Sequence, residues 1–120
     1  MKKKTLVLGA SLSPSRYSHM SINRLKLSGH EVVAIGLKQG LVQGVNINTD
    51  LMPFKNIHTV TLYLNPKNQI PYYDYILSLK PKRVIFNPGT ENPGFYNILK
   101  MNNIDFEVAC TLVLLSTNQY

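Results

Sequence analysis

Short apolar runs alternate with segments of helical spacing along the chain. The first run, residues 5–10 (Thr-Leu-Val-Leu-Gly-Ala), is almost wholly apolar and ends at turn residues, which is typical of a strand buried on both faces. Residues 18–28 then place Ile22 and Leu25 at helical spacing, and Gly29 follows where a left-handed C-terminal cap is expected. The pattern therefore predicts a central strand followed by a helix.

The next segments extend this pattern to a strand-helix-strand unit. Residues 31–36 (Glu-Val-Val-Ala-Ile-Gly) predict a second strand, and crossovers between such parallel strands are right-handed in nearly all proteins. The middle of the chain is less regular, and only residues 44–47 resemble a brief strand there. Residues 58–64 are rich in β-branched and aromatic side chains and predict another strand.

Two Asn-Pro pairs mark the starts of helices in the second half of the chain. Asn65 is a typical helix N-cap and Pro66 a typical first helical residue. The apolar face of residues 72–79 predicts that this helix continues. Pro71 would interrupt it, so either the helix begins near Pro71 or its first turn is irregular. Asn92-Pro93 predicts a second such start.

The last strands flank this second helix. Residues 82–86 predict a strand that leaves through the turn at 87–90, and residues 106–110 predict the last core strand. Strands that alternate with ten-residue helices indicate an α/β fold, an open parallel sheet with helices on both faces. No repeat, linker or low-complexity segment divides the sequence, so residues 1–120 are expected to form a single domain.

Composition agrees with a globular domain and limits its chemistry. The chain has 120 residues, of which 44% are hydrophobic and 16% charged, far from the composition of disordered proteins. A single cysteine, Cys110, rules out an internal disulfide and any all-cysteine metal site. The expected compartment is therefore the reducing cytoplasm.

The formal charge of +7 raises the question of nucleic-acid binding. Only residues 2–4 form a basic run, and the other cations are scattered, so the charge indicates a surface biased toward anionic ligands rather than a nucleic-acid site. The apolar run after these lysines is too short for a signal peptide, and no later run could span a bilayer. We therefore expect no membrane partner.

The segment Gly9–Ser18 joins the first predicted strand to the first predicted helix and carries the main candidate chemistry. It holds small residues, four serines and Arg16. Small residues allow close approach of the backbone, hydroxyls and amides donate hydrogen bonds, and a helix N-terminus attracts anions. The segment therefore predicts a phosphate-binding loop, although the three-glycine fingerprint of NAD-binding domains is missing.

A second candidate follows the second strand, where NAD-binding domains usually place a carboxylate for the ribose hydroxyls. This chain has Gly36, Leu37 and Lys38 at that corner. A lysine without a carboxylate suits a nucleotide that carries a phosphate on its ribose, as in coenzyme A (CoA) or NADP. An ordinary exposed lysine explains the same residue equally well.

Taken together, motifs spread over the whole chain resemble those of the small stand-alone CoA-binding proteins. The segments that carry the resemblance are Gly9-Ala10-Ser11 with Pro14, Arg16 and Ser18, then residues 34–36, residues 59–66, residues 87–93, and Ala109-Cys110-Thr111. These proteins are similar to the CoA-binding domain of the succinyl-CoA synthetase α subunit and have a Rossmann-like fold. Ala109 departs from the pattern, because many relatives have an arginine there.

The resemblance implies a ligand and a set of contacts. It implies that Gly9, Ala10, Ser11, Pro14, Arg16 and Ser18 surround the CoA phosphates. Gly36 and Lys38 would lie near the adenosine portion. The remainder of the ligand would be flanked by Leu64, Asn65 and Pro66, by the turn from Asn87 to Thr90 that contains Pro88 and Gly89, and by Cys110.

No catalytic constellation accompanies these candidates. No acidic pair falls on adjacent strand-end loops, and no histidine is placed to activate Cys110. The leading hypothesis is therefore a CoA-binding or acyl-CoA-binding module without catalytic machinery. The alternatives are a minimal NADP-linked oxidoreductase, a detached subunit of an acyl-CoA ligase, and a redox sensor in which Cys110 forms a mixed disulfide with CoA. The apolar segment 112–115 is a candidate interface for a homo-oligomer.

Overall fold

One sheet of seven strands, in the order β3-β4-β2-β1-β5-β6-β7, organises the fold of the computed structural model, which describes residues 2–120. The strands are β1 (Thr5–Ala10), β2 (Val32–Gly36), β3 (Gly40–Val42), β4 (Val45–Asn48), β5 (Thr59–Leu62), β6 (Arg83–Phe86) and β7 (Asp105–Val108). The helices are α1 (Tyr17–Leu27), α2 (Pro66–Gln69), the 3-10 turn η1 (Ile70–Tyr72), α3 (Tyr73–Leu79), α4 (Pro93–Met101) and α5 (Thr111–Ser116).

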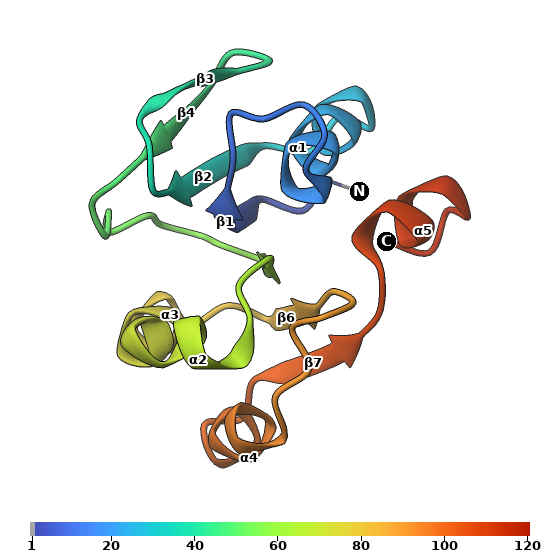
Figure 1. The fold of residues 1–120 in the computed structure, drawn as a ribbon. Helices are drawn as coiled ribbons and strands as arrows, with labels where there is room; N and C mark the ends of the chain where they lie inside the picture. The colour runs from blue at the N-terminus through green and yellow to red at the C-terminus, as the bar shows by residue number, and fades with distance from the viewer. Residues whose placement is uncertain (1) are drawn as a thin grey trace.

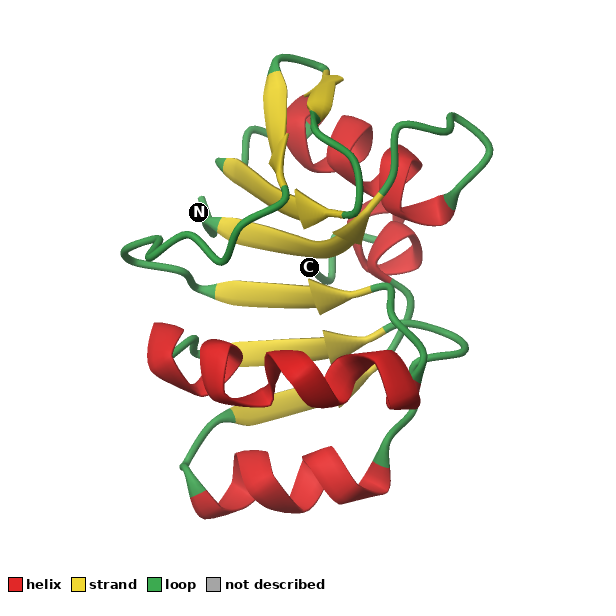
Figure 2. Cartoon of the chain, turned by 60° about the vertical axis from the view of Figure 1, so that its left-hand side comes forward, coloured by secondary structure: helices red, strands yellow, loops and turns green. Residues whose placement is uncertain are grey.

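The sheet is parallel except at one edge, as Figure 2 shows by the common direction of its central arrows. The predicted open α/β sheet is confirmed, and the antiparallel β3–β4 hairpin is an addition to it. Residues 40–42 carried too little apolar pattern to predict β3. The signal that the sequence did offer is the Gln43-Gly44 pair, because both residues have positive φ (50° and 76°) and form a tight hairpin turn.

Helices cover both faces of the sheet, and each face has its own core. Alternate residues of β1 point to opposite faces, so Leu6 and Leu8 pack with α3 and α4 while Val7 packs with α1. Figure 1 shows α1 and α5 together on one side and α2, α3 and α4 on the other. The three-layer arrangement leaves the carboxyl ends of the parallel strands as the edge where loops meet.

The helical segment around Pro71 is irregular, as one of the two sequence-based alternatives predicted. Asn65 caps α2 by accepting a hydrogen bond from the Asn68 backbone N–H at 2.9 Å. The chain then passes through η1, which contains Pro71, before α3 begins at Tyr73. Pro71 stands in the first positions of η1, where a backbone N–H has no partner within the turn, so the missing donor is tolerated.

The end of the chain corrects two expectations. The predicted last core strand, residues 106–110, is instead β7 at the edge of the sheet, where Val108 is 54% exposed. Cys110 lies beyond the end of β7, at the N-cap position of α5. The apolar segment 112–115 lies within α5, which packs beside α1, so part of its apolar surface is buried within the chain. No helix within residues 2–120 has both the length and the apolar character needed to cross a membrane.

Tyr120 closes the opposite edge of the sheet, at the amino ends of the strands. Its hydroxyl hydrogen-bonds the Thr5 hydroxyl, and its ring stacks beneath the Arg83 guanidinium, 4.4 Å from the ring centroid. His30 lies against the same ring, with the two centroids 4.9 Å apart, and its Nδ1 accepts a hydrogen bond from the Lys3 backbone N–H at 2.9 Å. The Arg83 cation and His30, whose Nδ1 accepts a hydrogen bond, are therefore packed against the same ring.

We expect the stability of the fold to decrease as the pH falls below about 6.5. Burial lowers the pKa of His30 from 6.5, and the nearby Lys3 and Arg83 charges lower it further. Burial and the Arg83 charge likewise lower the pKa of His58 from 6.5. The unfolded chain therefore binds protons first, and the stabilisation present above 6.5 is lost as the pH falls toward the folded-state pKa values.

Urea unfolding between pH 7.5 and 5.5 would measure this dependence. The double variant His30→Asn, His58→Asn cannot take up these protons, so its free energy of unfolding should change less over the same interval. An equal pH dependence in the wild type and the double variant would contradict the assignment to these histidines.

Candidate ligand-binding site

A cavity of about 560 Å³ opens at the carboxyl edge of the sheet, between β1 and β5. This is where the direction of the chain reverses, because β2 and β4 lie on one side of β1 whereas β5, β6 and β7 lie on the other. Ligands of open α/β sheets bind at such a switch point, and this volume lies within the usual range for small-molecule sites. The cavity is therefore the candidate site.

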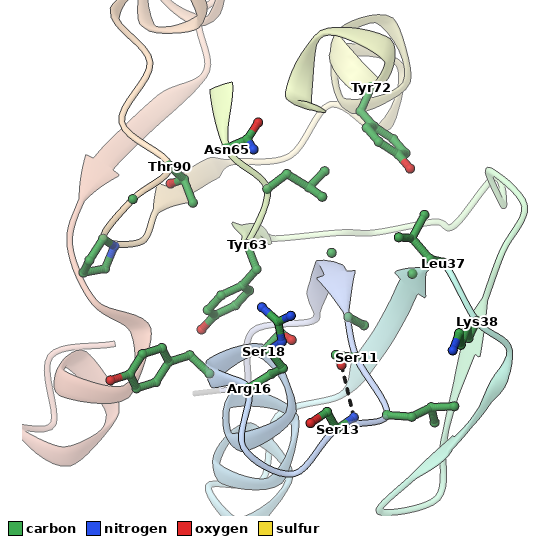
Figure 3. A pocket seen from close by; sticks show the side chains of 18 residues that line it. Ser11, Ser13, Arg16, Ser18, Leu37, Lys38, Tyr63, Asn65, Tyr72 and Thr90 are labelled. Carbon is green, nitrogen blue, oxygen red and sulfur yellow. Dashed lines mark hydrogen bonds between the residues drawn. The ribbon is translucent and has the colours of Figure 1, made fainter. Parts of the chain in front are cut away.

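Most of the residues predicted to bind the ligand line this cavity, although they come from four separate loops. The lining residues among them are Gly9, Ala10, Ser11, Arg16, Ser18, Gly36, Lys38, Leu64, Asn65, Pro88 and Gly89. Figure 3 shows Arg16 and Ser18 at the start of α1, with Leu37 and Lys38 on the loop after β2. Packing of the parallel strands brings these loops to one edge.

Thr90, the last residue of the turn expected to flank the ligand, also lines the cavity. Other lining residues were not named as contacts: Leu12, Ser13, Tyr17, Leu37, Tyr63 and Tyr72. Most of them lie next to predicted residues within the same loops. The sequence therefore indicated whole loops better than it indicated single contact residues. Tyr72 is different, because it reaches the cavity from η1 across the sheet edge, as Figure 3 shows. No local pattern in the sequence marks such a residue.

Three predicted residues are absent from the lining, within the part of the chain described here, for local reasons. Pro14 is exposed at the outside of the first loop, and Pro66 is the exposed first residue of α2. Cys110 sits at the cap of α5, beyond the strand that was expected to deliver it to the cavity. Their contact with a ligand stays a prediction without support from the cavity.

Asn87 is also missing from the lining, because its amide is used inside the protein. The side chain is 2% exposed. Its Nδ2 donates to Thr61 Oγ1 at 2.7 Å and to the Leu62 carbonyl at 2.8 Å, while its Oδ1 accepts from the Thr111 backbone N–H at 2.9 Å. The amide thus joins β5, the end of β6 and the start of α5.

Two glycines let the strand ends converge on the floor of the cavity. Gly9 is an extra residue in the pairing of β1 with β2, and its φ of +92° is unfavourable for other residues. A Cβ atom at Gly9 would lie 3.1 Å from the Tyr63 carbonyl oxygen, and one at Gly36 would collide with the Ala10 carbonyl oxygen. These glycines therefore let neighbouring strand ends pack closely, and the cavity floor at Gly9 and Gly36 is backbone.

The first loop leads directly into the N-terminus of α1. Ser11 Oγ accepts a hydrogen bond from the Ser13 backbone N–H at 3.1 Å, the bond drawn in Figure 3. Arg16 occupies the cap position of α1, and its side chain makes no capping hydrogen bond. Because the first amides of a helix have no partner within the helix, the N-terminus of α1 presents hydrogen-bond donors and partial positive charge near the cavity.

The charge of the lining favours an anionic ligand. Arg16 and Lys38 are its cations, and the lining residues described by the structure include no aspartate or glutamate. Burial raises the pKa of Tyr63 above 10, so its phenol stays neutral. No cluster of three or more His, Cys, Asp or Glu side chains that could hold a metal ion occurs within residues 2–120.

Three solved structures share this architecture over most of their length. A crystal structure described as that of an uncharacterized protein is 49% identical, with a TM-score of 0.97, and the match covers 100% of this chain and 99% of the other. A protein from Thermus thermophilus is 24% identical with a TM-score of 0.86, covering 99% of this chain and 91% of its own. A hypothetical protein from Pyrococcus horikoshii OT3 is also 24% identical, with a TM-score of 0.85 and coverage of 97% and 83%.

Among curated protein sequences, none matches the chain significantly. A family model does match it, and this model describes a CoA binding domain. The match extends over residues 3–116 and therefore includes every strand, every helix and all the loops that line the cavity. The chain thus belongs to the CoA-binding domain family, as its sequence motifs led us to expect.

Proposed function

We propose that this protein is a CoA-binding or acyl-CoA-binding module that holds the phosphates of its ligand on the loop Gly9–Ser18. The observation that carries the proposal is the cavity at the switch point, in which a backbone floor, Arg16 and the open N-terminus of α1 meet. Each of these features stabilises phosphate oxygens, and the neutral or cationic lining adds no repulsion. Membership of the CoA-binding domain family supports this choice of ligand.

The rest of the ligand is assigned by position around the cavity. Gly36 and Lys38 would lie near the adenosine portion and its ribose phosphate. Leu64, Asn65 and the turn at 88–90 would flank the remainder of the molecule, on the side where Tyr72 and Thr90 also line the cavity. Binding, rather than a chemical step, is the activity that this arrangement supports.

Calorimetry of the purified protein with CoA, acetyl-CoA and dephospho-CoA tests the proposal. We expect saturable binding of CoA, and NADPH titrated in the same way distinguishes the alternative cofactor. Absence of heat with all three CoA compounds, at several temperatures, would overturn the proposal. Tighter binding of NADPH than of CoA would favour the NADP alternative.

Lys38→Gln should weaken CoA binding about two- to fivefold, because an exposed ion pair contributes about 0.5–1 kcal/mol. Lys38 is exposed at the rim of the cavity. Dephospho-CoA lacks the ribose phosphate, so its affinity should be the same for the variant and the wild type. Calorimetry with both ligands measures the difference.

The matched control is Lys55→Gln, which removes an exposed lysine that is not part of the cavity lining. This variant should bind CoA as the wild type does. If Lys38→Gln weakened the binding of both ligands equally, Lys38 would not recognise the ribose phosphate.

A further inference from the structure

Two buried amide side chains, Gln69 and Asn92, are hydrogen-bonded to each other behind the wall of the cavity. Gln69 is completely buried and Asn92 is 8% exposed. The Asn92 Nδ2 group donates to Gln69 Oε1 at 2.9 Å and to the Tyr73 hydroxyl at 2.7 Å. Neither side chain lines the cavity, so neither is expected to touch the ligand.

The Gln69 amide spans the gap between two loops that do line the cavity. Its Nε2 donates to the Leu64 carbonyl at 2.8 Å and to the Thr90 carbonyl at 2.8 Å. Leu64 belongs to the loop after β5, and Thr90 belongs to the loop after β6. One NH₂ group therefore fixes the separation of two adjacent walls, in a buried setting where an unpaired carbonyl would be costly.

The chemistry of the pair requires an amide at residue 69. Both N–H bonds of Gln69 point at carbonyl oxygens, and a carboxylate or an apolar side chain could donate to neither. Asn92 fixes which way the Gln69 amide points, because its own N–H occupies the Gln69 oxygen. Asn92 Oδ1 separately caps α4 by accepting from the Phe95 backbone N–H at 3.3 Å.

We propose that Gln69 is a positioning residue of the ligand cavity, oriented by Asn92, which holds the Leu64 and Thr90 loops at the spacing that the ligand needs. The inference rests on the proposed function, because these loops flank the portion of CoA beyond its phosphates and adenosine. Loss of the Gln69 amide should therefore weaken binding of that portion and leave the phosphate loop unaffected.

The test compares CoA with adenosine 3′,5′-bisphosphate, which keeps the adenosine, the 3′-phosphate and one 5′-phosphate of CoA but lacks the second phosphate of the diphosphate and the pantetheine arm. In Gln69→Met, which keeps the length of the side chain, we expect CoA affinity to fall tenfold or more. The affinity for adenosine 3′,5′-bisphosphate should change less than twofold. A general loss of structure would weaken both ligands together, so the ratio of the two affinities separates positioning from stability.

Asn92→Asp provides a second variant, which keeps the cap of α4 because aspartate caps helices as well as asparagine does. It replaces the N–H that orients Gln69 with an oxygen, so CoA affinity should fall at least fivefold and the bisphosphate affinity should stay constant. Asn97→Asp, at an exposed position of the same helix, is the control and should bind both ligands normally.

The outcomes distinguish this inference from the function on which it rests. If the wild type binds CoA but Asn92→Asp and folded Gln69→Met bind both ligands with wild-type affinity, the inference is wrong and the proposed function stands. Equal weakening of CoA and the bisphosphate also contradicts it. If the wild type binds no CoA, both the proposed function and the inference fail.

Discussion

Gly36→Ala is expected to lower the free energy of unfolding by about 3–4 kcal/mol, the size of the larger single-residue effects in protein cores. A Cβ atom at Gly36 would overlap the Ala10 carbonyl oxygen and lie 3.0 Å from Ile47 Cγ2. The oxygen belongs to the backbone of β1, the central strand, so it cannot move aside as a flexible side chain can. Urea unfolding of the variant measures the loss.

The same substitution at Gly94 should not destabilise the protein. Gly94 lies in the first turn of α4, and a Cβ atom there would meet only Asn92 Oδ1 at 3.5 Å, an ordinary contact. Gly94→Ala should therefore be neutral or stabilise the protein by up to about 1 kcal/mol, because alanine favours helix. Similar effects of the two substitutions would show that the close approach at Gly36 is not a constraint.

Asn87→Ala is expected to destabilise the protein by about 2–4 kcal/mol. The substitution removes the partners of the Thr111 backbone N–H and the Leu62 carbonyl, and it leaves a buried space. Thr61 keeps its hydrogen bond to Thr111 Oγ1 at 2.8 Å, so the network is weakened rather than abolished. Thermal and urea unfolding measure the change.

This result bears on the role of Asn87 at the site. Asn97→Ala, at an exposed position, should change stability by less than about 0.5 kcal/mol and is the control. If Asn87→Ala lost CoA affinity while its stability stayed at the wild-type level, Asn87 would contact the ligand directly, as the sequence motifs implied.

The sequence predicted the strands of the central sheet and the helices between them because these elements have strong local patterns. The continuous apolar run of β1 and the Asn-Pro starts of α2 and α4 each follow from a few neighbouring residues. The loop Gly9–Ser18 was recognisable for the same reason. Its composition is unusual locally, and its place after the first strand puts it at the carboxyl edge.

The unpredicted features depend on contacts between distant parts of the chain. Tyr72 lines the cavity beside residues of the loop Gly9–Ser18, which is far away in the sequence. Asn87 turns inward because the start of α5 supplies a backbone N–H to its amide. Gln69 carries no local sequence signal, since its carbonyl partners lie 5 and 21 residues away in the sequence. The edge position of β7 likewise depends on sheet order, which periodicity does not report.

The central claim is that the loop Gly9–Ser18 binds the phosphates of CoA, and the most direct test is an NMR titration of ¹⁵N-labelled protein with CoA. The proposed function predicts that the largest amide shifts fall within this loop and the start of α1, and that a second group falls at residues 36–38. Saturable shifts confined to other surfaces, with the amides of residues 9–18 unchanged, would contradict it.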